Sequence, residues 1–374
     1  MARAASIGKM VIPSNFKSFI GNARVVEILF RAVERNRLPH ALIFAGPPGV
    51  GKCTLAILLA QYLNCYSATP EGGCGTCASC RRILAVLESR YISCLSLKGQ
   101  AACGSCPNCR TLSSRHPDVR LVQPEKTTIR IEQIRELISE IAFQPFEAKY
   151  RVVILDPAEQ MRLEAHNSML KTLEEPPSST FIILVTSNPY MLLPTIRSRA
   201  RLLHFGGIPQ RRIQEYLMKE GRPREEAELA ALFSQGSLGA ALTFDSTQYR
   251  EARTWALQFV FLLLKRGRFA ELSALAAALT KDKDLFLIWL DATAAILRDI
   301  YYAQVFPSRA GQPDLSEQLA DLARSTPRAE VVSAISAVKR LRSALQNNVN
   351  RQIALESLFL RQTGVTEGTA GHPY

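Results

Sequence analysis

Residues 41–54 read ALIFAGPPGVGKCT. The apolar residues at the start of this stretch predict a short buried strand, and the run 55–63 after the glycine-rich turn predicts a helix. A strand, a glycine turn, a lysine and a helix are together typical of a phosphate-binding loop, in which backbone N–H groups and the helix N-terminus face an anion. The alternative is a chance glycine turn before a helix. The residues expected to hold the nucleotide are Gly46, Pro47, Pro48, Gly49, Val50, Gly51, Lys52, Cys53 and Thr54.

One position of this loop departs from the pattern. Lys52 is expected to reach the outer phosphates, but the next residue is Cys53, where the motif has a serine or threonine hydroxyl that ligates Mg²⁺. A thiol is a soft ligand that suits Mg²⁺ poorly. Thr54 lies one residue too late to take that role without a shift. We therefore expect ATP and Mg²⁺ to be held weakly, or held without hydrolysis.

The length and the charge of the chain limit the number of domains and the kinds of partner to expect. The 374 residues are enough for two or three domains with cores of their own. No apolar run reaches the ~20 residues that span a bilayer, and the N-terminus has no apolar signal core, so a cytoplasmic protein is expected. The net charge is +13, from 46 Lys and Arg less 33 Asp and Glu, spread along the chain. This balance favours nucleic acid or acidic partners and says nothing about the fold.

Eight of the nine cysteines form two sets with the same spacing, C-x8-C-x2-C-x2-C. The sets are offset by 29 residues, as are the stretches before them, so a helix and a cysteine knuckle have been duplicated. In a cytosolic chain this pattern indicates metal rather than disulfides, and four thiolates suit a closed, structural zinc site. The alternative is reduced free thiols, more plausibly in one copy than in both. The two sets are Cys65, Cys74, Cys77 and Cys80, and Cys94, Cys103, Cys106 and Cys109.

Residues 151–156 read RVVILD and predict a second buried strand that ends in a carboxylate. In a phosphate-loop protein, Asp156 would hold Mg²⁺ through water. Many such ATPases have a glutamate next, to polarise the attacking water, but this chain has Pro157. Glu159 follows where a helix over residues 158–175 should already have begun, so we expect it to point elsewhere. The missing glutamate is the second group for ATP hydrolysis that the chain lacks, after the hydroxyl at position 53.

Four polar residues near predicted strands, two of them as a pair, have two interpretations each. Asn188 follows the apolar strand 181–185, where it would contact a γ-phosphate or merely cap the next turn. His40 directly precedes the first strand. It would be a catalytic group or, alternatively, a structural residue or one close to the adenine. His116 and Asp118 have the appearance of a metal or catalytic pair, but Pro117 and the adjoining strand favour a turn.

The order of motifs resembles a known family. After the loop and the knuckles come His116-Pro117-Asp118, Ile134-Arg135-Glu136-Leu137, the run LKTLEEPP at 170–177, and Leu193-Pro194-Thr195-Ile196 followed by Ser198-Arg199. This order is similar to that of bacterial DNA polymerase III clamp-loader subunits of the AAA+ class, strongly over residues 15–205 and loosely beyond. The resemblance implies an α/β P-loop AAA+ domain over 1–205, with a parallel sheet, flanking helices and inserted zinc knuckles. It further implies a small helical lid over 206–247, an all-α collar over 248–362 and a flexible tail over 363–374. Helices within the collar are expected over 249–266, 269–279, 285–305, 329–345 and 350–360.

Within this family the chain resembles the delta prime subunits more than the tau/gamma motor. Cys53, Pro157 and Gly239 stand where tau/gamma has a loop hydroxyl, a catalytic glutamate and a nucleotide-sensing lid arginine. The three losses imply a part of the polymerase holoenzyme that is not an efficient ATPase alone. The family's Ser-Arg-Cys motif supplies an arginine finger to the next subunit's ATP; Ala200 replaces the cysteine, but Arg199 is kept and is implied to be such a finger. The second zinc knuckle departs from the family, which usually has one.

The resemblance also implies partners. They are the tau/gamma and delta subunits in a hetero-pentamer, the sliding clamp and primed DNA, with no membrane. Two alternatives stay open at this point. One is an ATP-hydrolysing tau/gamma-type motor or another AAA+ remodeller, and the other is a zinc-dependent nucleic-acid-binding module with a vestigial phosphate loop.

Overall fold

The computed structural model describes residues 13–91, 116–125, 127–265, 268–305, 316–345 and 349–363. The second predicted cysteine set and most of the predicted tail 363–374 lie outside these ranges. The chain forms two compact units, Met1–Phe244 and Asp245–Tyr374. Within the described ranges, no helix combines the length and the apolar character needed to cross a bilayer. The domain boundaries drawn from the sequence at 205, 247 and 362 stay predictions.

The first unit contains a five-stranded parallel sheet with the order β2-β3-β4-β1-β5. Every residue of β1, β3 and β4 is buried, as expected for strands covered on both faces. Since the carboxyl ends of parallel strands share one edge of a sheet, the phosphate loop after β1 lies beside the ends of β3 and β4. The strands are β1 (Ala41–Ala45), β2 (Val119–Val122), β3 (Arg151–Leu155), β4 (Thr180–Thr186) and β5 (Arg201–His204).

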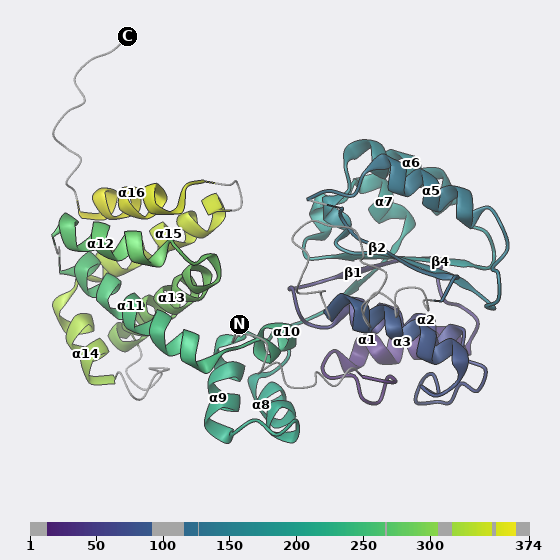
Figure 1. Ribbon diagram of the computed structural model, residues 1–374, viewed down its shortest axis with the longest axis horizontal. Coiled ribbons are helices and arrows are strands. Elements are labelled where there is room, and N and C mark those ends of the chain that lie inside the picture. Colours follow the sequence, from purple (N-terminus) through teal and green to yellow (C-terminus); the bar gives the residue numbers. More distant parts are fainter. Residues whose placement is uncertain are drawn as a thin grey trace, which may run out of the picture. The chain divides into compact units, whose positions relative to one another are not determined.

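Helices cover both faces of this sheet (Figure 1). Leu42 and Phe44 of β1 pack toward the layer of α1 (Ala23–Glu34), α2 (Lys52–Leu63) and α3 (Ala78–Tyr91). The alternate residue Ile43 packs toward the opposite layer. That layer consists of α5 (Ile131–Ile141), α6 (Leu163–Glu174) and α7 (Pro194–Arg199). The predicted α/β class, with a parallel sheet and flanking helices, is confirmed.

Two details of this unit differ from expectation. The helix predicted from residue 158 begins only at Leu163, after the short 3₁₀ helix η1 (Ala158–Gln160). Met161 is held extended in a parallel bridge with Ile129, and Arg162 N donates to Ile129 O at 3.3 Å, which delays the helix. The four-residue strand β5 was not predicted, because the exposed side chains at its two ends give it no apolar run.

A small helical lid completes the first unit. It consists of α8 (Gln210–Lys219), α9 (Arg224–Phe233) and α10 (Leu238–Leu242), packed on one another around a core of their own. The Arg222 guanidinium donates to the backbone carbonyls of Ala241 and Phe244, both at 3.2 Å, and also to that of Leu242. These bonds satisfy carbonyls that a helix C-terminus leaves without partners, so they fix α10 within the lid.

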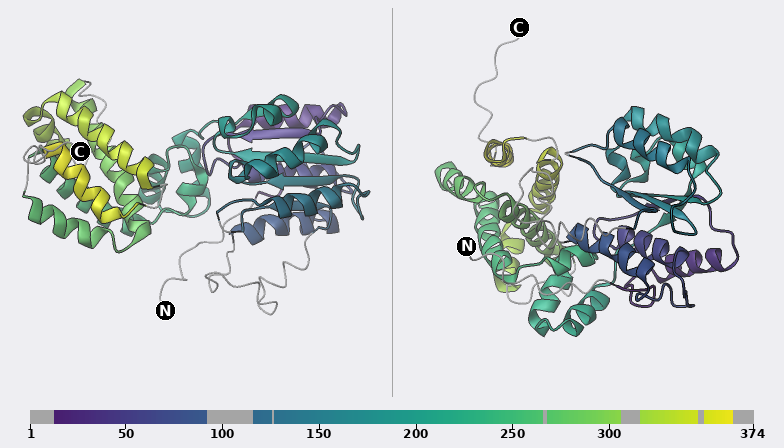
Figure 2. Two further views of the ribbon diagram at one scale, coloured as in Figure 1. Left: turned by 90° about the horizontal axis from the view of Figure 1, so that it is seen from above. Right: turned by 45° about the vertical axis from the view of Figure 1, so that its right-hand side comes forward.

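The second unit is helical throughout its described part (Figure 2). Its central helix is α13, whose buried Trp289 packs edge-on against Phe259 with ring centroids 5.0 Å apart. The five helices expected here are present, and α14 was not predicted. The helices are α11 (Ser246–Leu264), α12 (Phe269–Leu279), α13 (Lys283–Val305), α14 (Ser316–Ser325), α15 (Arg328–Ala344) and α16 (Arg351–Thr363).

Candidate functional site

A cavity of about 430 Å³ lies at the carboxyl edge of the sheet, within the range of about 300–1,000 Å³ typical of small-molecule sites. The loop, the ends of β3 and β4 and the lid all contribute to it. Of the residues expected to hold a nucleotide, those that line the cavity are Pro48, Gly49, Val50, Gly51, Lys52, Cys53, Thr54 and Asp156. Residues that were not predicted also line it, among them Phe19, Ile20, Glu159, Thr186, Ser187, Tyr216, Leu238 and Leu242.

The loop has the backbone shape of a phosphate cradle. Gly51 has a φ of +92°, caps α2 and thereby places the N-terminus of that helix at the cavity. Gly46 has a φ of +155°, and a Cβ there would lie 2.2 Å from the Phe205 carbonyl oxygen, so only glycine fits. The Lys52 ammonium donates to the carbonyls of Gly46 at 2.6 Å and Pro47 at 2.7 Å. Gly46 and Pro47, the two predicted loop residues that do not line the cavity, thus hold the lysine at its edge.

Glu159 lines this cavity, so the expectation that it points elsewhere is wrong. Because residues 158–160 form a 3₁₀ turn rather than an α-helix, Glu159 reaches the end of β4. Its Oε1 accepts from Ser187 N at 3.0 Å and from Ser187 Oγ at 2.5 Å. Burial opposes ionisation, but these hydrogen bonds outweigh it and hold the pKa of Glu159 below its ordinary value. Its Oε2 is buried and has no hydrogen-bond partner within the described ranges.

Asn188 is not among the described residues that line the cavity. Its Oδ1 accepts from Tyr190 N at 3.0 Å and caps the 3₁₀ helix η2 (Pro189–Met191). Its own N donates to Thr186 Oγ1 at 3.1 Å. The geometry favours the capping interpretation, and Thr186 and Ser187 are the polar residues at this strand end that face the cavity.

Arg199 lies at the end of α7 and belongs to a different cavity, of about 720 Å³. Its Nε donates to Glu174 Oε1 at 2.6 Å, a second nitrogen contacts the same carboxylate, and Nη1 donates to Thr195 O at 2.9 Å. Arg197 and Arg201 line the same cavity. Arg199 is absent from the described lining of the loop cavity.

The first cysteine set comes together in space. The sulfur atoms of Cys65, Cys74, Cys77 and Cys80 all lie within 4.8 Å of one another, and those of Cys74 and Cys80 are 3.9 Å apart. Four thiolates around a zinc ion at about 2.3 Å would be about 3.8 Å apart, so the set fits a tetrahedral metal. Among the described residues, the four knuckle cysteines and Cys53 form no disulfide.

Backbone N–H groups point at these sulfurs. Cys65 Sγ accepts from Cys74 N at 3.2 Å, Cys74 Sγ from Cys77 N at 3.3 Å, and Cys77 Sγ from Cys80 N at 3.4 Å. Hydrogen bonds from Cys77 and Thr76 lower the pKa of Cys74 to about 6, whereas burial raises the pKa of Cys65 and Cys80. Such donors favour thiolates, the form in which cysteine ligates metal.

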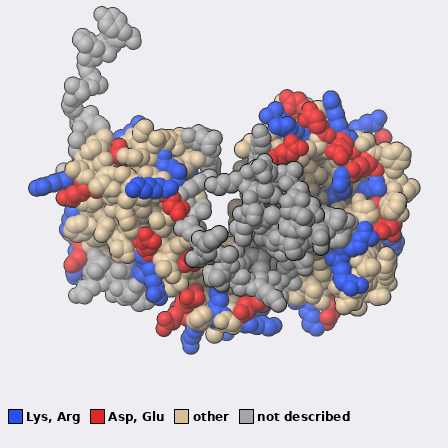
Figure 3. Space-filling view, viewed as in Figure 1, with Lys and Arg blue, Asp and Glu red and all other residues tan. Residues whose placement is uncertain are grey.

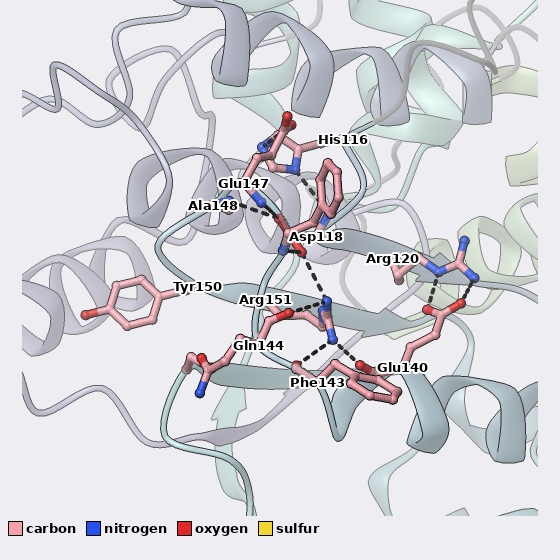
Figure 4. A network of polar contacts seen from close by, with 12 residues as sticks. His116, Asp118, Arg120, Glu140, Phe143, Gln144, Glu147, Ala148, Tyr150 and Arg151 are labelled. Atoms are coloured by element: carbon pink, nitrogen blue, oxygen red, sulfur yellow. Dashed lines mark hydrogen bonds and ion pairs between the residues drawn. The ribbon is translucent and has the colours of Figure 1, made fainter.

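The two candidate catalytic histidines have structural surroundings. His40 Nδ1 lies 2.9 Å from Thr180 O, and its ring stacks on Phe181. His116 Nδ1 accepts from Asp118 N at 3.2 Å, and its Nε2 lies 3.4 Å from a Glu147 carboxylate oxygen (Figure 4). Burial lowers the pKa of His116. These contacts favour the structural interpretation of both.

Asp118 holds the loop between α5 and β3 (Figure 4). Its carboxylate accepts from the backbone N–H groups of Phe146, Glu147 and Ala148 at 2.7, 2.9 and 3.0 Å, and from Arg151 at 3.2 Å. Burial opposes ionisation, but the hydrogen bonds outweigh it and lower the pKa of Asp118. Because both carboxylate oxygens accept two hydrogen bonds each from this chain, Asp118 is a structural rather than a catalytic carboxylate.

Comparisons with known proteins agree with this geometry. A family model described as "DNA polymerase III, delta subunit" matches residues 21–89 and 84–209. The DNA polymerase III subunit delta' of Bacillus subtilis is 29% identical over 340 residues, which are 90% of this chain and 94% of that protein. The delta' subunit of Escherichia coli is 30% identical over 90% of this chain and 92% of its own. The tau subunit of Escherichia coli is 27% identical, but over 62% of this chain and 32% of its own.

Proposed function

The chain belongs to the DNA polymerase III delta subunit family, and from this premise we propose that it acts as the delta prime subunit of a clamp loader. In that role it assists ATP-dependent loading of the sliding clamp onto primed DNA, as one member of a hetero-pentamer with tau/gamma and delta. The proposal rests on the share of each chain that the matches cover. Delta' relatives align along nine-tenths of both chains, whereas tau aligns over a third of its own length.

The residues of the loop support nucleotide binding more than hydrolysis. Gly51, Lys52 and the N-terminus of α2 would hold phosphates, and Asp156 would hold a hydrated magnesium ion that screens their charge. Cys53 gives magnesium no hydroxyl, and Pro157 no water-polarising carboxylate. We therefore propose a site that binds nucleotide weakly and turns it over slowly or not at all.

Arg199 is proposed to act in the nucleotide site of an adjoining subunit. The guanidinium is oriented by Glu174 and by Thr195 O, and it lies in a cavity distinct from the loop cavity of its own chain. In the neighbour's site it would stabilise the negative charge that develops on the transferred phosphoryl group. In other NTPases, such arginine fingers raise the rate of hydrolysis by about 10³–10⁵-fold.

The first cysteine set is proposed to hold one structural zinc ion, which would close the turn between α2 and α3. All four ligand positions are occupied by thiols, so none is left open for a substrate. The predicted second set would hold another ion. The α2–α3 turn lies far along the sequence from Arg199, and no catalytic step needs the metal.

One observation favours a second candidate, an ATP-hydrolysing subunit. Glu159 brings a carboxylate into the loop cavity beside the end of β4, despite its shifted position in the sequence. Were it the base that activates water, the purified chain would hydrolyse ATP alone and Glu159→Gln would abolish that activity. We expect no such activity, because Ser187 holds one carboxylate oxygen and the loop lacks the hydroxyl for magnesium.

Reconstitution tests the proposed function. The ATPase rate and the loading of clamp on primed DNA are measured for the assembly with and without this chain. We expect both to require it, and the isolated chain to show no turnover above background. Full activity without it, or rapid turnover by the chain alone, would overturn the proposal in favour of the motor.

A further inference from the structure

The lid touches the phosphate loop through backbone atoms. Gly239 N, in the first turn of α10, donates to Gly49 O at 2.9 Å. A Cβ on Gly239 would lie 3.2 Å from Gly49 Cα. A Cβ on Gly49 would lie 2.1 Å from Ser237 Oγ, and Gly49 already has a φ of +73°. We call these three residues, Gly49, Ser237 and Gly239, the glycine clasp, since a side chain at either glycine would crowd the other segment.

Both sides of the clasp are held firmly. On the loop side, Lys52 binds the carbonyls of Gly46 and Pro47. On the lid side, Ser237 caps α10 by accepting from Ala240 N at 3.2 Å, and Arg222 holds the carbonyls at the other end of the helix. The clasp therefore joins two ordered segments, and the loop cannot widen at Gly49 without breaking the bond from Gly239.

The clasp also bears on how a nucleotide enters. Gly49 and Gly239 both line the cavity, together with Leu238 and Leu242 of the same lid helix. To bind phosphates, Lys52 has to leave the carbonyls of Gly46 and Pro47. If the lid also has to yield room above the loop, that movement breaks the hydrogen bond from Gly239 N to Gly49 O.

We propose that the glycine clasp is an autoinhibitory contact, which keeps the loop cavity closed and lowers its affinity for nucleotide. The absence of a side chain at position 239 is then more than the loss of a sensing arginine, because the loop backbone at Gly49 lies where the first atom of such a side chain would be. The inference rests on the proposed nucleotide site and is independent of Arg199. Since apparent affinity scales with the open fraction, any substitution that opens the clasp tightens nucleotide binding.

The test compares three variants of the full chain by titration with a fluorescent ATP analogue in the presence of Mg²⁺. Gly239→Ala and Gly239→Val crowd the clasp without adding charge, and alanine suits a helix better than glycine does. Ala240→Arg is the control, because it adds an arginine one position away on an exposed site. Hydrogen exchange across residues 237–242 reports opening of the clasp directly, and thermal unfolding checks that each variant is folded.

We expect Gly239→Ala and Gly239→Val to bind the analogue about two- to tenfold more tightly, the effect of one backbone hydrogen bond, with faster exchange over residues 237–242. Ala240→Arg should retain the exchange rate of the natural chain. Unchanged or weaker binding by folded Gly239 variants would overturn the proposal, as would tighter binding without faster exchange. Binding by no variant would overturn it too, yet it would leave standing the role proposed for Arg199, which is measured on the assembly.

Discussion

At the scale of residues, the cationic side chains of Lys52 and Arg199 both bind oxygen atoms of their own chain. The consequences for phosphate binding differ between the two. Lys52 is bound to carbonyls of the loop it serves, so it has to exchange partners before it can contact a phosphate. Arg199 is bound to a carboxylate and a carbonyl, so its guanidinium is already oriented for the phosphate that we propose it contacts in an adjoining subunit. An oriented donor loses less conformational freedom on binding than a mobile one.

Cys53 is the residue that most directly limits magnesium. We predict that Cys53→Ser strengthens nucleotide binding in the presence of Mg²⁺ by about tenfold, equivalent to about 1.4 kcal/mol, because a hydroxyl replaces a soft thiol at the ligand position. Titration with and without Mg²⁺ measures the effect. Cys53→Ala is the matched control, since it removes the thiol from this buried position without supplying a hydroxyl. Equal gains in both variants, or a gain that persists without Mg²⁺, would contradict the explanation.

Asp118 is predicted to carry a pH-dependent part of the stability. Its pKa is lower in the folded chain than its ordinary value near 4, so its contribution is present above that value and is lost as the pH falls through the folded pKa. Asp118→Ala should lower the free energy of unfolding near pH 7 by about 3–5 kcal/mol, because Arg151 is left buried without its carboxylate. Denaturant unfolding at a series of pH values measures both effects. A variant that keeps the full acid dependence of the natural chain would rule Asp118 out as its source.

At the scale of elements, the zinc knuckle is predicted to organise the start of α3. Cys80 lies in that helix and is fully buried, so Cys80→Ala should remove one zinc ion per chain and speed hydrogen exchange in α3. Metal analysis of the natural chain should find two ions if both cysteine sets are intact. A zinc content unaffected by Cys80→Ala would contradict the assignment of the first set, and one ion in the natural chain would mean that one copy has decayed.

The sequence allowed prediction of those elements whose pattern is local. The strand at 41–45, the loop and the helix after it follow from apolar runs and glycine spacing, and the first cysteine set from its repeat. Glu159 was misplaced because the turn that contains it is fixed by a bridge between Ile129 and Met161, which are distant in sequence. The short strand β5 likewise depends on pairing with β1 rather than on its own residues.

The candidate site was predictable on the loop side and not on the lid side. The phosphate loop and Asp156 carry a motif, whereas Tyr216, Leu238 and Leu242 reach the cavity only because the lid folds back toward it. Gly239 was recognised as a missing arginine, but the backbone contact that takes its place has no signature in the sequence.

At the scale of the whole molecule, the net charge can be compared with the charges on one face of the surface. On the face drawn in Figure 3, the described Lys and Arg side chains lie among Asp and Glu side chains rather than in one basic patch. The proposed function rests on the matches to clamp-loader subunits rather than on the net charge of +13.

Within the first unit, the cavity of the phosphate loop and the cavity of Arg199 are lined by separate sets of residues. This separation is consistent with the proposal that the chain holds a nucleotide at one site and contacts a neighbour's nucleotide from the other. The separation makes the central claim testable, because the two sites can be altered independently.

The most direct measurement is the single-turnover rate of ATP hydrolysis by the reconstituted assembly that carries Arg199→Ala in this chain alone, with Arg211→Ala on the exposed face of the lid as control. We predict that Arg199→Ala lowers the rate at the adjoining site by about 10³-fold or more, leaves ATP binding to the assembly largely intact, and does not change the fold of the chain. A rate equal to that of the assembly with the natural chain would contradict the account.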